Sequence, residues 1–525
     1  MYRNAILAGM FVVSTIFGAG KHWDSHFPVG CYLYTYVWEQ NTNAQVQDLS
    51  IAVKKLASLG FTYVYLGGVK DNALWNTMLE ICDAHRISII PQLDFAYISS
   101  PDVSKVPARA ALAAEFIKKY KDHPSVAAFS VKEEPSPDYL PAIKEYYTIV
   151  LREVPDAPLM LLHNSLPAIQ QMKPPYPRIS GTDRYCFWWE WGTAGNRATP
   201  RSALRWFHTQ MDAFYQSSAQ QNAEFHAVFT ANTLEGFRTT NKVRTMFYPS
   251  SIAEDTRQTL FERVLKLANS TDQGFYRISE DIVGYWKYYR PPENCVRAMA
   301  WLSVMEGARS ISSWSYGPLR EDMRNFAHRS SNASQQREYI TPISGWDMSG
   351  TSALNEYSAF AREIQRYAPL LRALKKETTR IIGTPAGHET VTTERPTSPV
   401  ITVQETDVVW RSFTVSGYTG KVIIIVNTAV GTWCSGRSPD QLSAADTFRI
   451  DEKGEVIDYT PNTAARTIRA AAADSFGCVD LRTGEIVSDS NGALTLSVEP
   501  GGADLLFISP RSNDEDKRLR KQFGL

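Results

Sequence analysis

The chain has no excess of charge of either sign. Lys and Arg together number 55, and Asp and Glu together also number 55. Recognition of nucleic acids depends on a basic patch or stripe, and the sequence has no basic cluster. We therefore expect no nucleic-acid partner.

Cysteine is scarce as well. Six cysteines are scattered over 525 residues, and none of them forms the Cys-x-x-Cys pair typical of zinc sites. Cys434 and Cys478 are the only plausible disulfide partners. The sequence thus predicts no disulfide scaffold, and it offers no ligand set for a metal ion or another cofactor.

Long hydrophobic runs are missing after the first twenty residues. Arg3 gives a positive start, residues 5–17 an apolar core and residues 18–20 a small-residue cleavage region, a pattern typical of an export signal. A membrane anchor is the alternative, but the apolar run is shorter than the roughly 20 residues that span a bilayer. We expect residues 1–20 to be a signal peptide, the mature protein to be secreted or periplasmic, and no membrane contact beyond the signal.

What the chain does have is an alternation of strand-like and helix-like segments over its first two thirds. Residues 29–36 alternate as a strand, and residues 49–56 carry apolar side chains at helical spacing. The eight predicted strands are residues 29–36, 62–66, 87–95, 126–131, 159–162, 179–187, 225–229 and 309–314. This rhythm predicts a (β/α)8 TIM barrel over residues 21–377, with a doubly wound sheet as the alternative. Residues 233–292 fit the rhythm poorly and are expected to be an insertion.

From residue 378 the pattern changes to short strands separated by Gly, Asn and Asp turns. The strands predicted here are residues 400–403, 408–414, 421–427, 494–498 and 504–508. Such a pattern is typical of a β-sandwich, so we expect an all-β accessory domain over residues 378–511. Residues 512–525, rich in Asp, Glu, Lys and Arg, are expected to form a solvated, charged tail.

In barrel enzymes, the residues that follow each strand line the active face. Here these positions are rich in carboxylates and aromatic rings. They are Trp38, Glu39, Asp94, Tyr97, Lys132, Glu133, Glu134, His163, Asn164, Asp183, Arg184, Tyr185, Trp314 and Tyr316. Glycosidic cleavage needs paired carboxylates, because one protonates the leaving oxygen while the other attacks or activates water. Aromatic faces stack on sugar rings, so we expect a carbohydrate substrate.

A tryptophan-rich stretch follows the sixth predicted strand. Trp188, Trp189 and Trp191 surround Glu190. Successive side chains of a strand point to opposite faces, so the tryptophans cannot all point inward. We expect Trp188, Trp189 and Glu190 to contribute to a sugar-binding platform.

Residues 131–135, Val-Lys-Glu-Glu-Pro, end the fourth predicted strand. They resemble the Asn-Glu-Pro or Asp-Glu-Pro ending of strand four in clan A glycoside hydrolases, where the Glu before the proline is the general acid/base. The resemblance implies that role for Glu134 and implies a glycosidase acting on a poly- or oligosaccharide. Further segments are similar to the passage into strand eight, to the closing helix and to the accessory sandwich of that group: residues 289–309, 362–371, 480–485 and 499–503.

Strand seven departs from that family, whose nucleophilic Glu ends this strand. Residues 226–232 end without a carboxylate. Either Glu235 takes the role, or strand seven lies elsewhere, or the reaction does not use that nucleophile. Asp183 is the best substitute, and Glu190 is another. A separation of ~6.5–9.5 Å between Glu134 and Asp183 would predict inversion, and ~5–5.5 Å would predict retention.

Several candidates have structural alternatives. Glu133 is expected to be a supporting or solvated group, and His163 is more often structural than a base. Asp183 could bind a sugar hydroxyl or pair with Arg184, and Lys132 could form a salt bridge or contact an acidic substrate. Two rival functions also stay open: an inactive barrel that binds carbohydrate, and a different barrel enzyme such as a polysaccharide lyase.

Overall fold

The computed structural model describes residues 21–34, 42–69, 73–187, 200–231, 233–239, 275–279, 282–288, 291–314, 336–341, 351–377, 401–403, 407–433, 459–472, 476–488, 493–510 and 514–525. The predicted signal peptide lies outside these residues. Within them, no helix has the length and apolar character needed to cross a membrane.

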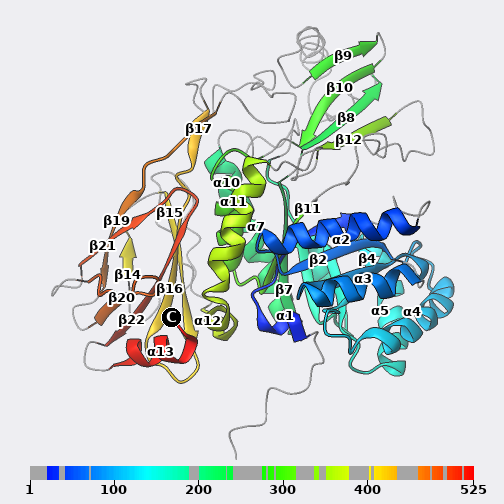
Figure 1. Cartoon of the computed structure of the whole chain (residues 1–525), viewed down its shortest axis with the longest axis horizontal. Coiled ribbons are helices and arrows are strands. Elements are labelled where there is room, and N and C mark those ends of the chain that lie inside the picture. Colours follow the sequence, from blue (N-terminus) through cyan, green and yellow to red (C-terminus); the bar gives the residue numbers. More distant parts are fainter. Residues whose placement is uncertain are drawn as a thin grey trace, which may run out of the picture. The chain divides into compact units, whose positions relative to one another are not determined.

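Eight parallel strands close into a barrel and follow one another around it in chain order. They are β1 (Val29–Tyr34), β2 (Tyr63–Val69), β3 (Ser88–Leu93), β4 (Phe129–Glu133), β5 (Leu159–His163), β6 (Ile179–Asp183), β7 (Glu224–Thr230) and β11 (Ser310–Trp314). Figure 1 shows the chain coloured along its sequence, with β2, β4, β7 and β11 of the barrel labelled. Each overlaps one of the eight predicted strands, so the predicted (β/α)8 barrel is confirmed. Closure of the sheet excludes the doubly wound alternative, which is an open sheet.

Helices alternate with these strands. They are α1 (Lys21–Ser25), α2 (Thr42–Ser58), α3 (Ala73–Ala84), α4 (Val106–Tyr120), α5 (Leu140–Glu153), α6 (Leu166–Gln171), α7 (Pro200–Gln220), α10 (Cys295–Met305), α11 (Ser352–Gln365) and α12 (Ala368–Ala373). In α5 the buried positions recur at helical spacing and form one apolar face: Ala142, Ile143, Tyr146, Tyr147, Ile149 and Val150. The barrel strands are mostly buried because helices cover the outside and side chains fill the inside. All five residues of β5 are accordingly buried.

Part of the expected insertion forms a separate sheet. Its four antiparallel strands lie in the order β12 (Gln336–Thr341), β8 (Thr233–Thr239), β10 (Ile282–Tyr288) and β9 (Phe275–Ser279). Three of these strands come from residues 233–292, which explains why that stretch did not fit the βα rhythm. The fourth strand, β12, comes from beyond β11.

The C-terminal strands form two antiparallel sheets. One has the order β13 (Leu374–Lys376), β15 (Val408–Val415), β16 (Lys421–Asn427), β22 (Ala503–Pro510) and β20 (Phe476–Asp480), and the other has β14 (Ile401–Val403), β19 (Arg466–Ala472) and β21 (Ala493–Val498). β17 (Gly431–Trp433) pairs with β18 (Tyr459–Pro461). Trp410 and Ile423 from the first sheet share one buried core with Ile468 and Leu496 from the second. The predicted β-sandwich is thereby confirmed.

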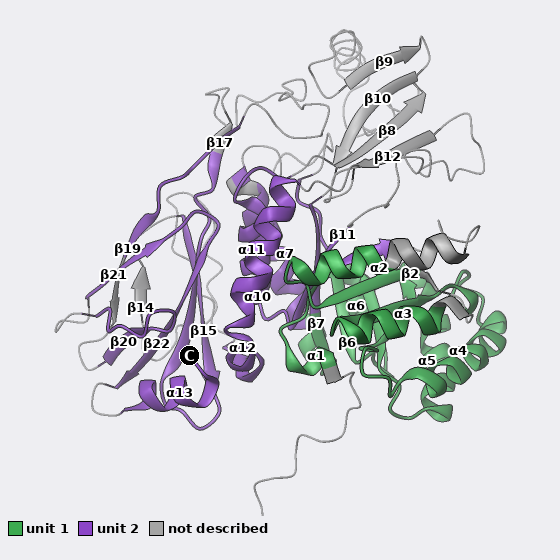
Figure 2. Ribbon diagram, viewed as in Figure 1, with its two compact units in different colours: residues 1–30, 34–182, 217–225 green, residues 31–33, 183–216, 226–525 purple. Residues whose placement is uncertain are grey.

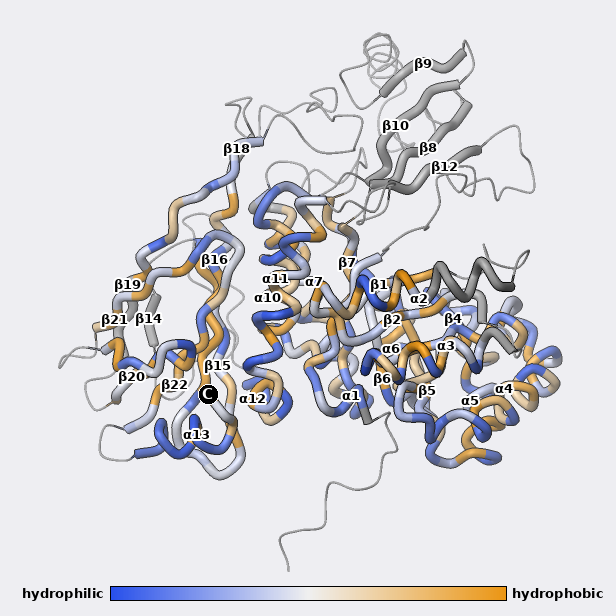
Figure 3. The backbone as a smooth tube through the Cα atoms, in the orientation of Figure 1, coloured by the Kyte–Doolittle hydropathy of each residue, from blue (hydrophilic) through white to orange (hydrophobic). Residues whose placement is uncertain are grey.

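Two details of the C-terminal region differ from expectation. β13 pairs with β15 although it precedes the predicted boundary at residue 378. Residues 512–525 are no solvated tail, because they include the helix α13 (Glu515–Phe523), hydrophilic along its length (Figure 3), in which Glu515 and Leu519 are buried. Cys478 is a free, buried thiol, and Cys434, the other plausible disulfide partner, lies outside the described residues.

The chain divides into two compact units, drawn in two colours in Figure 2. The first comprises residues 1–30, 34–182 and 217–225 and holds β2 to β5 and most of β6. The second comprises residues 31–33, 183–216 and 226–525 and holds β11, most of β7 and the C-terminal sheets.

Candidate active site

Strand β4 carries a bulge directly before its end. Ser130 pairs with Met160 of β5. Glu133, three residues further along, pairs with Leu162, which is only two residues further along β5. Side chains alternate along a regular strand, so the extra residue brings Ser130 and Glu133 to the same face. Bulges often re-aim side chains next to active sites.

Glu133 lies beside the buried Tyr65 of β2, whose hydroxyl hydrogen-bonds its carboxyl and donates to the Ser130 hydroxyl at 2.8 Å. Its Oε1 is buried and has no hydrogen-bond partner within the described structure. Burial raises the pKa of Glu133 to about 7. The Tyr65 hydrogen bond and the charge of Lys132 oppose this rise, whereas the charge of Glu134 adds to it. Glu133 is therefore half-buried, with one carboxyl oxygen fully enclosed, which fits the supporting rather than the solvated alternative that the sequence left open.

Glu134 follows the strand in a left-handed backbone conformation, with φ of 46°. Such values are uncommon for residues other than glycine, and they cluster at functional sites. The Glu134 N–H donates to the carbonyl oxygen of Leu162 at 2.9 Å. Its Oε2 accepts from Nδ2 of Asn164 at 3.0 Å. Glu134 is exposed, so its carboxylate is both held by the end of β5 and open to solvent.

The Lys132 ammonium lies against two tyrosine rings, 4.9 Å from the ring centre of Tyr97 and 4.6 Å from that of Tyr139. It donates to the Tyr97 hydroxyl at 3.2 Å, and the same hydroxyl accepts from the Glu133 N–H at 3.2 Å. Burial lowers the pKa of Lys132, against the opposing effect of the charges of Glu133 and Glu134. Tyr97 thus fastens two consecutive residues at the end of β4.

Three further predicted site residues follow neighbouring strands. Asp94 begins the short 3-10 helix η2 (Asp94–Ala96) directly after β3 and is exposed. His163 ends β5, and both ring nitrogens are buried without a hydrogen-bond partner among the described residues. Burial lowers the pKa of His163 to about 3, so its ring is neutral near pH 7. The ring is part of the buried interior of the barrel. Asp183 ends β6 and is buried at 4% exposure.

Tyr185 and Trp314 form an aromatic pair. Tyr185 lies two residues after β6, and Trp314 is the last residue of β11. Their ring centres are 5.6 Å apart and their planes differ by 18°, a stacked arrangement. Both residues are half-buried, so part of the pair remains accessible. The sequence predicted each residue at a strand end, and the structure brings the two together.

Strand seven lies where the sequence predicted it, and neither Thr230, its last residue, nor Ala231 after it carries a carboxylate. Glu224, at the opposite end of β7, forms an ion pair with Arg178 at 3.2 Å. Glu235 lies in β8, with Trp286 and Tyr339 as its Cα partners on either side. It is thus part of the inserted sheet and not of a barrel strand.

Several predicted site residues lie outside the described residues: Trp38, Glu39, Trp188, Trp189, Glu190 and Tyr316. Two residues at this end of the barrel, Tyr65 and Tyr139, are not among the residues predicted from the sequence. Tyr65 sits in the middle of β2, and Tyr139 ends the short 3-10 helix η4 (Pro137–Tyr139). A list of strand ends could find neither of them.

A second group of charged side chains lies at the opposite end of β11, where barrels conserve residues for stability. Glu306 follows α10 and is fully buried. It accepts from Arg411 of β15 at 2.8 to 3.0 Å and also pairs with Lys376 and His208. Burial would raise the pKa of Glu306, but these cations outweigh it and hold the pKa well below its usual range. The group connects the helices α7 and α10 to the first strands of the sandwich.

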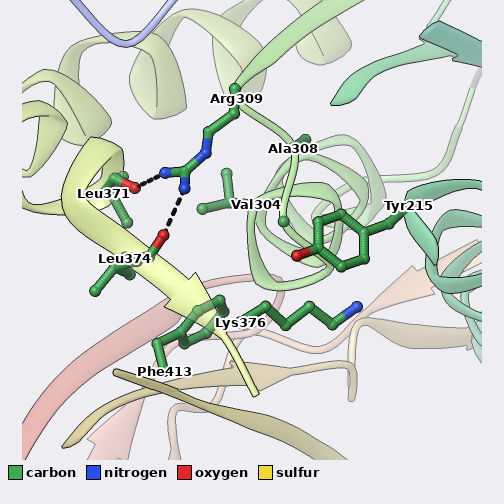
Figure 4. A pocket seen from close by; sticks show the side chains of 9 residues that line it. Tyr215, Val304, Ala308, Arg309, Leu371, Leu374, Lys376 and Phe413 are labelled. Carbon is green, nitrogen blue, oxygen red and sulfur yellow. Dashed lines mark hydrogen bonds between the residues drawn. The ribbon is translucent and has the colours of Figure 1, made fainter. Parts of the chain in front are cut away.

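A small pocket beside this group is shown in Figure 4. Arg309 donates there to the carbonyl oxygens of Leu371 and Leu374. The Lys376 ammonium lies 4.2 Å from the ring centre of Tyr215. None of the predicted site residues lines this pocket. Within the described ranges, no three His, Cys, Asp or Glu side chains are arranged to hold a metal ion.

The sequence matches no protein-family profile and no curated protein sequence. Among solved structures, the chain is similar to an α-amylase from Geobacillus thermoleovorans, with a TM-score of 0.42 and 8% identity over 93% of this chain and 99% of that chain. It is also similar to α-galactosidase I from Mortierella vinacea, with a TM-score of 0.43, and to a β-L-arabinopyranosidase from Geobacillus stearothermophilus, with a TM-score of 0.42. Both of these matches have 8% identity and cover 94% of this chain and 99% of the other chain. The barrel and the sandwich are established by the strand pairing described above.

Proposed function

We propose that the protein is an exported glycoside hydrolase that cleaves glycosidic bonds of a poly- or oligosaccharide. The observation that carries the proposal is the end of β4. There, the exposed carboxylate of Glu134 is held by Asn164 and stands next to the buried carboxyl of Glu133. Barrel enzymes place their reacting groups at this end of the strands, and carboxylates in unlike environments suit acid/base work.

In the proposed reaction Glu134 is the general acid/base. It gives its proton to the glycosidic oxygen as the bond from that oxygen to the anomeric carbon breaks. A second carboxylate then has one of two roles. In an inverting reaction it takes a proton from the water that attacks the anomeric carbon, and in a retaining reaction it attacks that carbon itself. Asp183 and Glu235 remain the candidates for this second group, and Tyr185 and Trp314 are candidates for stacking on the sugar.

The test is hydrolysis of a panel of glycans by the wild-type protein and by Glu134→Gln. The amide cannot donate the carboxyl proton, so we expect turnover to fall about 100-fold or more while sugar binding is retained. Asp138→Asn is the matched control, because Asp138 is an exposed carboxylate in the 3-10 helix η4 that follows β4. Equal turnover in the wild-type protein and Glu134→Gln would contradict the proposal.

Two other functions have distinct outcomes in the same assay. A barrel that only binds carbohydrate would bind glycans from the panel and hydrolyse none of them. A polysaccharide lyase would release products with an unsaturated ring that absorb ultraviolet light. The export proposal has a separate test, because the N-terminal sequence of the mature protein should begin near Lys21.

A further inference from the structure

The Lys132 ammonium at the end of β4 is held by neutral groups. It lies 4.9 Å from the ring centre of Tyr97 and 4.6 Å from that of Tyr139, and it donates to the Tyr97 hydroxyl at 3.2 Å. Among the described residues no carboxylate lies within ion-pair distance of it, although Glu133 and Glu134 follow directly in the chain. An ammonium carries three N–H donors. This one therefore keeps donors for an acceptor that the described part of the chain does not supply.

The Tyr97 hydroxyl also keeps a donor. Its oxygen accepts from the Lys132 ammonium and from the Glu133 N–H, each at 3.2 Å. A hydroxyl oxygen accepts through its lone pairs and can still donate its own proton. Within the described residues, no acceptor receives that proton. Burial raises the pKa of Tyr97 to about 12, so the hydroxyl stays protonated near pH 7. An ammonium and an O–H donor thus lie 3.2 Å apart and can share one acceptor.

The two tyrosines are fixed before any ligand binds. The carbonyl oxygen of Tyr97 accepts from the Arg109 guanidinium, which also donates to the Ser99 hydroxyl at 2.7 Å. The Tyr139 hydroxyl donates to the carbonyl oxygen of Ser99 at 3.4 Å. The segment after β4 is therefore joined to the segment after β3. Lys132, Tyr97 and Tyr139 are all half-buried, so the group is ordered and still partly accessible to solvent.

We propose that Lys132 and Tyr97 form an anion subsite that holds the carboxylate or sulfate of an acidic sugar near Glu134. The inference rests on the proposed glycosidase function and names its substrate class, an acidic poly- or oligosaccharide. The carboxylates of Glu133 and Glu134 would repel an acidic sugar at this strand end, and the ammonium offsets that repulsion. The ammonium supplies charge without a fixed direction, whereas the Tyr97 O–H supplies a directional hydrogen bond.

The first experiment changes only the charge of the ligand. An oligogalacturonide and its methyl ester share every sugar ring, but only the free acid carries carboxylates. A sulfated oligosaccharide and its desulfated form are the corresponding pair for sulfate. Isothermal titration calorimetry on the wild-type protein, or on Glu134→Gln where the ligand is hydrolysed, should give a Kd about 10- to 100-fold lower for the anionic member of one pair. The pair that shows this preference identifies the bound group as carboxylate or sulfate.

Two outcomes of this experiment would overturn the inference. One is an equal Kd for the two members of each pair. The other is a protein that binds no anionic member of either pair.

Two variants remove the two donors separately. Lys132→Met keeps the apolar stem and removes the charge, and Tyr97→Phe keeps the ring and removes the hydroxyl. Each should weaken binding of the preferred anionic ligand by about 10-fold or more and change binding of its uncharged counterpart by less than about 2-fold. Tyr97→Phe keeps the test open if Lys132→Met fails to fold. Lys144→Met removes an exposed cation on α5 and is the matched control, which should bind the anionic ligand as the wild-type protein does.

The variants can contradict the inference in two ways. An equal loss of affinity for the charged and the uncharged ligand would show that Lys132 and Tyr97 only support the shape of the site. Unchanged affinity for the anionic ligand in both variants would show that the anion binds elsewhere. Salt gives an independent check, because NaCl should weaken binding of the anionic ligand more in the wild-type protein than in Lys132→Met.

Hydrolysis separates this inference from the proposed function. Equal kcat/KM on acidic glycans and their uncharged counterparts, unaltered in Lys132→Met, overturns the inference and leaves the glycosidase function standing. No turnover of any glycan by the wild-type protein overturns the proposed function, while calorimetry still decides whether the anion subsite exists. Products that absorb ultraviolet light would replace hydrolysis by elimination and leave the anion subsite standing.

Discussion

Arg411 holds both carboxylate oxygens of Glu306 through one guanidinium nitrogen, with Nη2 lying 2.9 Å from Oε1 and 2.8 Å from Oε2. Both side chains are almost completely buried. Arg411 belongs to the sandwich and Glu306 to the barrel, so the sandwich is fastened to the barrel by charges that water cannot screen. We therefore interpret the sandwich as a brace for the barrel.

Replacing Arg411 by Met should strongly destabilise the protein. The change removes one cation and leaves the Glu306 carboxylate buried with fewer partners, which typically costs about 3–5 kcal/mol. Denaturant unfolding of the wild-type protein and Arg411→Met measures the difference. Lys517→Ala is the control, because it removes an exposed ion pair with Asp514 and should leave the midpoint unchanged. A midpoint for Arg411→Met equal to that of the wild-type protein would show that the sandwich does not brace the barrel through this group.

The carboxyl of Glu356 predicts how stability changes with pH. Glu356 on α11 accepts from the N–H of Asn294 at 2.7 Å, and burial raises its pKa to about 8. The folded protein therefore binds a proton that the unfolded chain releases above about pH 4.3. The unfolded state binds fewer protons across this window, so stability falls as pH rises toward 8.

Glu356→Gln removes this proton uptake. We expect the unfolding free energy to decline less steeply between pH 5 and 8 in Glu356→Gln than in the wild-type protein. Some decline should remain, because burial also raises the pKa values of Glu133 and Asp504 to about 7. Denaturant titrations at several pH values measure the slope. Glu153→Gln changes an exposed carboxylate and is the control. A parallel decline in the wild-type protein and Glu356→Gln would contradict this account.

The sequence predicted all eight barrel strands because short strand-like segments alternate along the chain with segments of helical periodicity. It also placed Glu134 and Asn164 at adjacent strand ends. It could not predict that the Glu133 carboxyl is enclosed. The bulge that turns Glu133 inward depends on pairing with β5, and the order of residues in β4 does not reveal it. Tyr65 was missed for a related reason, since a residue in mid-strand meets the site only when the barrel closes.

The C-terminal helix α13 is rich in charged residues and yet is packed against the sandwich. Residues 512–525 are strongly charged, which favours a solvated tail, yet Glu515 is buried at 8% exposure. Its carboxylate accepts from the N–H groups of Thr419 at 3.0 Å and Gly420 at 2.8 Å. A charged residue can therefore dock a helix when it satisfies backbone donors of a distant turn.

Glu515→Ala should accordingly destabilise the sandwich. The change leaves two backbone N–H groups without their acceptor, at a cost of about 1–3 kcal/mol. Thermal unfolding of the wild-type protein and Glu515→Ala measures the effect. Lys521→Ala alters an exposed residue of the same helix and should have no effect. If both variants unfold at the wild-type temperature, α13 is not docked through Glu515.

Asn164→Ala tests how the proposed general acid/base is held. The Asn164 amide donates to Oε2 of Glu134 at 3.0 Å and fixes the carboxylate of this residue, whose own backbone is left-handed. Without it, the carboxylate samples other positions, and misplacement by about 1 Å can cost on the order of 100-fold in rate. We expect kcat on a hydrolysed glycan to fall by about 10- to 100-fold with little change in KM, because Asn164 acts through Glu134 and not on bound sugar. Asn355→Ala, on an exposed position of α11, should retain wild-type kcat. A rise in KM at unchanged kcat would instead mean that Asn164 binds the substrate directly.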